Sequence, residues 1–127
     1  MASISYMMPN DAVWLDRCRM DRLFLEMGES GAQDVICRAM EALAKRLSAL
    51  EKCDLLTDRA MIAKLSKSLG AIAEQIGLES LSRVAGDVRA CASEGGDLVA
   101  LGATLARLVR IGDHSLAKVW ELQDLSG

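Results

Sequence analysis

Apolar residues recur at helical spacing along most of this chain, in stretches separated by short polar or glycine-containing breaks. The clearest stretch lies in residues 30–52, where Ser30 or Gly31 opens a pattern that continues to about Lys52. Its apolar positions are three or four residues apart, and they are Val35, Ile36, Ala39, Met40, Leu43, Leu47 and Leu50. This spacing places them on one stripe of an α-helix, so we predict a long helix with a single buried side.

Two shorter helices are predicted next by the same spacing. Thr57 or Asp58 caps the first of them, because short polar side chains favour the position before a helix. Its expected inward residues are Met61, Ile62, Leu65, Leu69 and Ile72. Gly77 interrupts the pattern, and a second helix is expected after it with Leu78, Leu81, Val84, Ala85 and Val88 on its inner side.

The last predicted helix begins after Asp97, which is a good capping residue, and runs to about Gln123. Gly112 is expected to loosen this helix midway. The residues expected to face inward are Leu98, Leu101, Leu105, Leu108, Val109, Leu116, Val119 and Leu122.

A further helix is predicted over residues 11–27, with Asn10 or Asp11 as its cap and Gly28 at its end. Short connections between amphipathic helices favour antiparallel neighbours. We therefore expect an all-α fold, an antiparallel up-and-down four-helix bundle with an additional N-terminal helix. The whole chain, residues 1–127, is expected to form one domain, with residues 1–28 as an N-terminal segment and residues 30–123 as the bundle.

The composition agrees with a helical domain and excludes several classes of function. Hydrophobic residues make up 51% of the 127 residues but aromatic ones only 3%, so the core must be aliphatic. The net charge of -3 gives no indication of a nucleic-acid binder, which would carry a concentrated basic patch. No apolar run approaches the roughly 20 residues of a membrane span. The N-terminus does not resemble a signal peptide, so a cytoplasmic protein is expected.

No residue pattern indicates an enzyme, a metal site or a cofactor. The four cysteines are far apart in the sequence and lack CxxC spacing, and buried free thiols in a reducing cytosol are the expectation. His114 is the only histidine, and a surface residue is expected there rather than a base, a ligand or a phosphoacceptor. Ser66 and Ser68 have no base nearby in the sequence, so a nucleophilic role is not expected.

One face of the predicted helix over residues 58–76 is thin and cationic. Small and cationic residues lie three or four positions apart on it, namely Lys64, Lys67, Ser68 and Ala71. Leu65, Leu69 and Ile72 occupy the opposite, core-facing side. Small residues let a partner approach closely, and an ammonium group attracts a carboxylate or phosphoryl group. A docking surface is one interpretation, and a solvated face without a partner is the other.

Residues 67–85, KSLGAIAEQIGLESLSRVA, resemble the signature of histidine-containing phosphotransfer (HPt) domains. That signature is His-x-Leu-Lys-Gly, two small residues, two variable residues, Leu or Ile, Gly, and a later Leu. In the preferred alignment, the matching positions are Leu69, Ala71, Ile72, Ala73, Ile76, Gly77 and Leu81. The segment EGGDLVAL before the last helix also resembles the family, and the helix order fits from about Ser30 to Leu122.

This sequence departs from the family at the reactive position. Lys67 stands where the family has its phosphorylated histidine, and Gly70 stands at the motif lysine. A second alignment places Lys64 at the histidine, Lys67 at the motif lysine and Ser68 at the glycine, but it loses the match at Gly77. Lysine has a pKa of about 10.4, so its protonated amine cannot attack a phosphoryl group near neutral pH.

The resemblance implies a non-catalytic HPt-like protein that binds a response-regulator receiver domain or a histidine kinase and modulates a phosphorelay. The residues expected to contact that partner are Lys64, Lys67, Ser68, Gly70, Ala71 and Gln75. A structural or oligomeric helical bundle is the alternative, with Trp14, Phe24 and Met27 as an interface. Active phosphotransfer through His114 is a third possibility.

Overall fold

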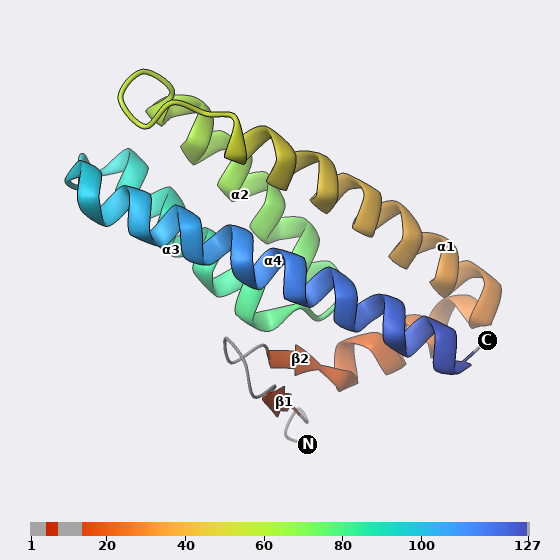
Figure 1. Ribbon diagram of the computed structural model, residues 1–127. Coiled ribbons are helices and arrows are strands. Elements are labelled where there is room, and N and C mark those ends of the chain that lie inside the picture. Colours follow the sequence, from red (N-terminus) through yellow and green to blue (C-terminus); the bar gives the residue numbers. More distant parts are fainter. Residues whose placement is uncertain (1–4, 8–13, 127) are drawn as a thin grey trace.

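The computed structural model describes residues 5–7 and 14–126, and nearly all of these residues are helical. The described elements are β1 (Ser5–Met7), β2 (Trp14–Asp16), α1 (Arg17–Glu51), α2 (Arg59–Gln75), α3 (Glu79–Ser93) and α4 (Leu98–Ser126) (Figure 1). The predicted all-α class is therefore confirmed, with four helices and one short ribbon of two strands in the described part of the chain.

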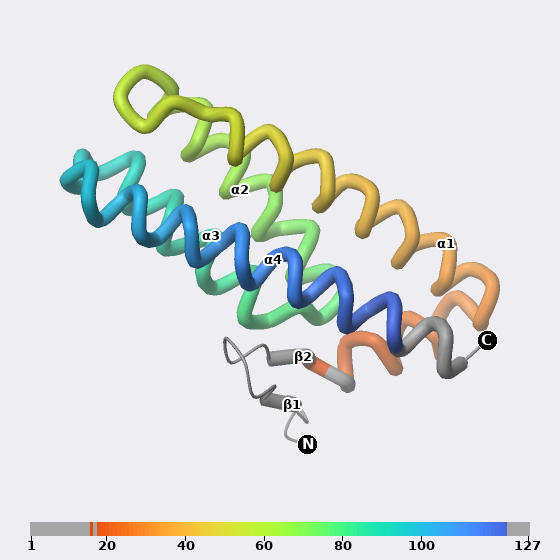
Figure 2. Tube along the Cα trace, viewed as in Figure 1, coloured from red at the N-terminus to blue at the C-terminus, as the bar shows by residue number. Residues whose placement is uncertain are grey.

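Each helix of the four packs against two others. Contacts join α1 to α2, α2 to α3, α3 to α4 and α4 back to α1, and they are most numerous between α2 and α3. The chain reverses direction at every connection, which can be followed from orange to blue along the tube in Figure 2. The apolar core lies between the four helices because each turns one apolar side toward the others.

The start of the first helix differs from the prediction. Residues 14–16 are extended and pair antiparallel with β1, with Met7 opposite Trp14. Helix α1 begins only at Arg17, where Asp16 Oδ1 accepts a hydrogen bond of 3.1 Å from the backbone N–H of Arg19. The predicted helix start at residue 11 is therefore wrong, since a strand occupies the last residues before Arg17. The predicted caps Asn10 and Asp11 lie outside the described residues.

Gly28 divides α1 as predicted. Its φ of 73° and ψ of 171° are not helical, so residues 17–27 and 29–51 form two helical segments that meet at a kink. A positive φ costs glycine little because it has no Cβ. The second segment carries the predicted stripe, in which Ile36, Met40, Leu43, Leu47 and Leu50 are buried.

Two residues predicted to face the core do not do so. Met61 is 49% exposed although its neighbour Ile62 is fully buried. Successive residues are rotated by about 100° around a helix axis, so Met61 lies at the edge of the buried stripe. Leu98 is 39% exposed because it occupies the first turn of α4.

Gly112 has a different role from the predicted one. It is buried within the continuous helix α4, and a Cβ at this position would lie 2.6 Å from Leu47 Cδ1. The prediction that Gly112 loosens the helix is therefore wrong, because the absence of a side chain lets α4 approach α1 closely.

The connections between helices are fixed by a few polar contacts. Asp97 Oδ1 accepts a hydrogen bond of 2.7 Å from Ala100 N–H, which confirms the predicted cap of α4. Asp58 precedes α2, but its carboxylate accepts from Asp54 N–H instead of capping the helix. The Arg59 guanidinium donates to the carbonyl oxygen of Cys91 at 3.0 Å, so the start of α2 is tied to the end of α3.

Candidate functional site

All six predicted docking residues belong to α2, and they lie in three different environments. Four side chains are exposed on the outer side of the helix, and they are Lys64, Lys67, Ala71 and Gln75. The inner side of the same helix is formed by fully buried residues, including Ile62, Leu69 and Ala73. The outer side is therefore available to a partner, whereas the inner side belongs to the core.

Ser68 lies at the boundary between α2 and α1. It is half-buried, and its Oγ accepts a hydrogen bond of 2.7 Å from Arg46 Nε of α1. Arg46 Nη1 also donates to the Ala42 carbonyl oxygen at 3.0 Å. Ser68 therefore holds a guanidinium group beside the outer side of α2.

Gly70 lies at the other boundary, between α2 and α3. A Cβ on Gly70 would lie 3.3 Å from Ala85 Cβ and 3.6 Å from the Ser82 carbonyl oxygen. Gly70 therefore lets α2 and α3 approach closely, and it contributes to helix packing rather than to the exposed centre of the outer face.

The α3 side of this surface adds another cation. Helices α2 and α3 run in opposite directions (Figure 1), and Gly70 of α2 lies against Ala85 of α3. By helical spacing, Lys67 is about one turn from Gly70 and Arg89 about one turn from Ala85, toward the same end of the helix pair. Arg89 is exposed, and so is Gly86, where an added Cβ would meet no atom within 4 Å. A small residue thus leaves open space about one turn from Arg89 on α3.

Together, Arg46, Lys64, Lys67 and Arg89 form what we call the cationic surface, which extends from α1 across α2 to α3. None of the four makes an ion pair with another residue in the described ranges. Lys64 and Lys67 come from the predicted set. Arg46 and Arg89 were missed by the sequence analysis, since they join the surface only through packing between helices.

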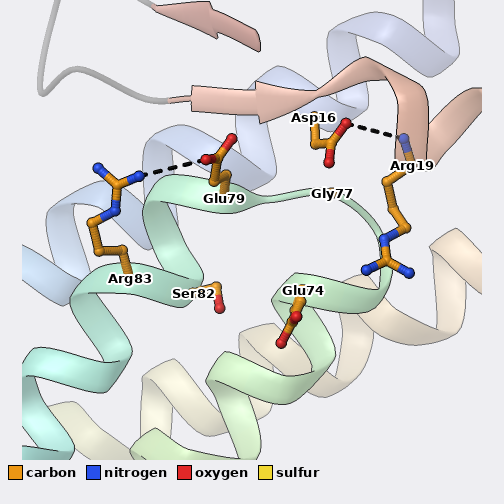
Figure 3. Close-up of a pocket in the computed structure, with 7 residues that line it drawn as sticks. All are labelled: Asp16, Arg19, Glu74, Gly77, Glu79, Ser82 and Arg83. Carbon is orange, nitrogen blue, oxygen red and sulfur yellow. Dashed lines mark hydrogen bonds and ion pairs between the residues drawn. The ribbon is translucent and has the colours of Figure 1, made fainter. Parts of the chain in front are cut away.

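A shallow cleft of about 330 Å³ lies beyond the end of this surface, where α2 turns into α3 (Figure 3). It is lined by Asp16, Arg19, Glu74, Gly77, Glu79, Ser82 and Arg83. Three of its charged groups already have partners: Arg83 pairs with Glu79 at 3.4 Å, and Asp16 caps α1. Charges of both signs thus line the cleft, in contrast to the cationic surface.

Gly77 attaches the N-terminal segment to the α2–α3 turn. Its φ is +80°, and its carbonyl oxygen accepts a hydrogen bond of 2.7 Å from Asp16 N–H. A Cβ at Gly77 would lie only 2.6 Å from the Asp16 carbonyl oxygen. Both the turn and the close approach therefore require glycine at this position.

The histidine and the cysteines lie away from the outer face of α2. His114 is exposed on α4. All four cysteines are free, but the expectation that they are buried is wrong: Cys37 is exposed, and Cys18, Cys53 and Cys91 are half-buried. Partial burial, and then the nearby Asp58 carboxylate, raise the pKa of the Cys53 thiol. Its Sγ donates to the Ala49 carbonyl oxygen at 3.3 Å.

In the part of the chain that the structure describes, no group of His, Cys, Asp and Glu side chains is arranged to hold a metal ion. Among the described helices, none has both the length and the apolar character that crossing a membrane requires. Comparisons with protein-family models, with curated proteins and with solved structures found no match for this chain.

Proposed function

We propose that this chain is a non-catalytic HPt-like protein that binds a receiver domain, or a histidine kinase, and modulates a phosphorelay. The proposed architecture is an antiparallel up-and-down four-helix bundle, with residues 17–27 of α1 as the additional N-terminal helix. In this proposal the partner contacts the outer side of α2 and the neighbouring cations of α1 and α3.

The observation that carries the proposal is the position of Lys67. In the resemblance to HPt domains Lys67 replaces the phosphorylated histidine, and its side chain is exposed in the middle of α2. The small residue Ala71 follows one turn later and is also exposed. Gly77, which matches the glycine near the end of the motif, has a positive φ and follows the C-cap residue Ile76 of α2.

The chemistry of lysine supports docking without transfer. A protonated amine has no electron pair to attack a phosphoryl group, so the surface offers charge but no nucleophile. Receiver domains carry an acidic pocket around the phosphorylated aspartate, and a cationic surface complements that charge. Such complementarity raises the association rate and favours the correct partner.

The direct test is a phosphotransfer assay with phosphorylated receiver domains, the wild-type chain and the variant Lys67→His. We expect no phosphoryl group on the wild type and detectable label on the variant, because the substitution supplies an imidazole at the docking position. Label on wild-type His114 would instead support active transfer through that residue. Failure of both proteins to accept label and to bind any receiver domain would contradict the proposal.

Binding is tested separately with Lys67→Glu and the matched control Lys45→Glu. Lys45 is exposed on α1 and is not one of the residues of the cationic surface. Because both variants replace lysine by glutamate, they change the net charge by the same amount. We expect Lys67→Glu to abolish receiver binding and Lys45→Glu to retain it. Equal effects of the two substitutions would mean that binding depends on overall charge and not on this surface.

The alternative function is a structural or oligomeric helical bundle. Large apolar side chains are exposed at the two chain-terminal helices: Leu25 is 86% exposed on α1, and Trp120 is 55% exposed on α4. Met27 of the predicted interface is 48% exposed, but Phe24 packs against the core. The side chain of Trp14 lies outside the described part of the structure. A tight dimer in sedimentation experiments that buries the Lys67 side chain would favour this alternative.

A further inference from the structure

Arg46 is a half-buried cation that the fold holds in place without a carboxylate. Its Nε donates to Ser68 Oγ at 2.7 Å and its Nη1 to the Ala42 carbonyl oxygen at 3.0 Å. No Asp or Glu side chain among the described residues lies within ion-pair distance of it. Arginine side chains bind carboxylate and phosphoryl oxygens through charge-assisted hydrogen bonds. Arg46 is therefore positioned to bind an anion that the chain itself does not supply.

The hydrogen bonds leave most of the guanidinium available to a ligand. An arginine side chain carries five N–H donors in a fixed plane, and the two bonds of Arg46 use two of them. The remaining donors include both hydrogens of Nη2. A planar group with several free donors matches the oxygens of a phosphoryl group better than a flexible ammonium does.

Ser68 determines where this guanidinium lies relative to α2. Lys64 is one turn before Ser68, and Ala71 is three residues after it, so both border the same shoulder of the helix. Ala71 is exposed and its side chain is short, which leaves room for an approaching group. Lys67 lies on the outer side between this shoulder and Arg89 of α3. An anion bound beside this shoulder of α2 would be contacted by side chains of both α1 and α2.

We propose that the cationic surface selects the phosphorylated form of the receiver, with Arg46 and Lys67 contacting its aspartyl phosphate. This inference rests on the proposed function. A phosphoryl group adds negative charge and three acceptor oxygens to the receiver's acidic pocket, and both match what Arg46 and the lysines offer. Because no nucleophile is present, no bond to phosphorus forms or breaks. The chain therefore binds the phosphoryl group without removing it from the receiver.

The experiment compares the affinity of one receiver domain in two states, untreated and loaded with beryllofluoride as a stable mimic of the aspartyl phosphate. Both titrations use the full chain and the same Mg²⁺ concentration, and both are followed by calorimetry. We expect the loaded receiver to bind about tenfold more tightly, the ratio expected of charge-assisted hydrogen bonds that only the phosphoryl group can accept.

Three variants assign this selectivity to the surface. Arg46→Gln should bring the affinity ratio close to one, because it weakens binding of the loaded receiver more than binding of the untreated one. Ser68→Ala should lower the ratio less, since it frees the guanidinium without removing it. Arg107→Gln is the matched control: Arg107 is exposed on α4, far along the sequence from the surface, and its loss should not change the ratio. Helical circular dichroism verifies that each variant is folded.

The outcomes distinguish failure of the proposed selectivity from failure of the proposed docking function. Equal affinity of the wild-type chain for both receiver states would overturn the selectivity and leave the docking function intact. A ratio that survives both Arg46→Gln and Ser68→Ala would also overturn it, because the selecting group would then lie elsewhere. If neither receiver state binds to the wild type, the proposed docking function itself is wrong.

Discussion

The two sides of α2 differ in what each contributes to the protein. On the inner side Ile62, Leu69 and Ala73 have no exposed surface, and they pack in one core cluster with residues of the other helices. On the outer side Lys64 and Lys67 are exposed and make no ion pair within the described chain. Substitutions on the inner side should therefore change stability, and those on the outer side should change binding.

The largest effect is expected at the centre of the inner side. Leu69→Ala should lower the free energy of unfolding by about 2–5 kcal/mol, because it removes buried methyl groups and leaves a cavity. Urea unfolding measures the change. Ile72→Ala is the comparison within the same helix, and its half-buried side chain predicts a smaller loss. If the two substitutions lower the free energy of unfolding by the same amount, the difference in burial between Leu69 and Ile72 does not determine stability.

A backbone position at the end of α2 should give the next largest effect. Gly77→Ala should cost about 1–3 kcal/mol, because alanine rarely adopts a positive φ and its Cβ would meet the Asp16 carbonyl oxygen. Gly86→Ala is the control, since a Cβ there meets no atom and lies within helix α3. That variant should gain about 0.5–1 kcal/mol from the higher helix propensity of alanine. A loss at both positions would contradict the described geometry.

Two serines on opposite sides of α2 should respond with opposite sign. Ser66 is fully buried, and its Oγ has no hydrogen-bond partner within the described structure, so Ser66→Ala should stabilise the fold by about 0.5–2 kcal/mol. Ser68→Ala removes the acceptor of Arg46 Nε and should cost about 0.5–1.5 kcal/mol. Thermal unfolding of both variants decides the matter, and destabilisation by Ser66→Ala would indicate an unrecognised partner.

The smallest change in stability is expected on the outer side. Lys67→Glu should alter the free energy of unfolding by no more than about 0.5 kcal/mol, because an exposed side chain without a partner contributes little. Urea unfolding of the variant beside the wild type provides the measurement. A loss comparable to that of Leu69→Ala would show that the ammonium group supports the fold.

Several local features of the fold followed from the sequence because short-range chemistry specifies them. Gly28 and Gly77 were predicted as breaks, and both adopt a positive φ that glycine tolerates. Asp97 was predicted as a cap, and it accepts the expected backbone hydrogen bond. The apolar stripe of residues 35–50 was predicted from its period alone. In each case the residues that determine the feature lie within a few positions of it.

The sequence analysis was wrong where distant segments decide the outcome. The role of Gly112 depends on Leu47 of α1. The start of α1 at Arg17 depends on strand pairing with β1. In both cases the deciding contact comes from outside the helix itself, from Leu47 in another helix or from the strand β1, so no helical periodicity could indicate it.

By itself, the sequence determined where most of the helices lie and which sides of those helices are apolar. Only the tertiary structure decided that Gly70 packs against α3 and that Ser68 holds Arg46 beside α2. The physical reason is that helical periodicity is local, whereas the guanidinium and its acceptor belong to different helices. Their meeting depends on how the helices pack, which no single stretch of the chain encodes.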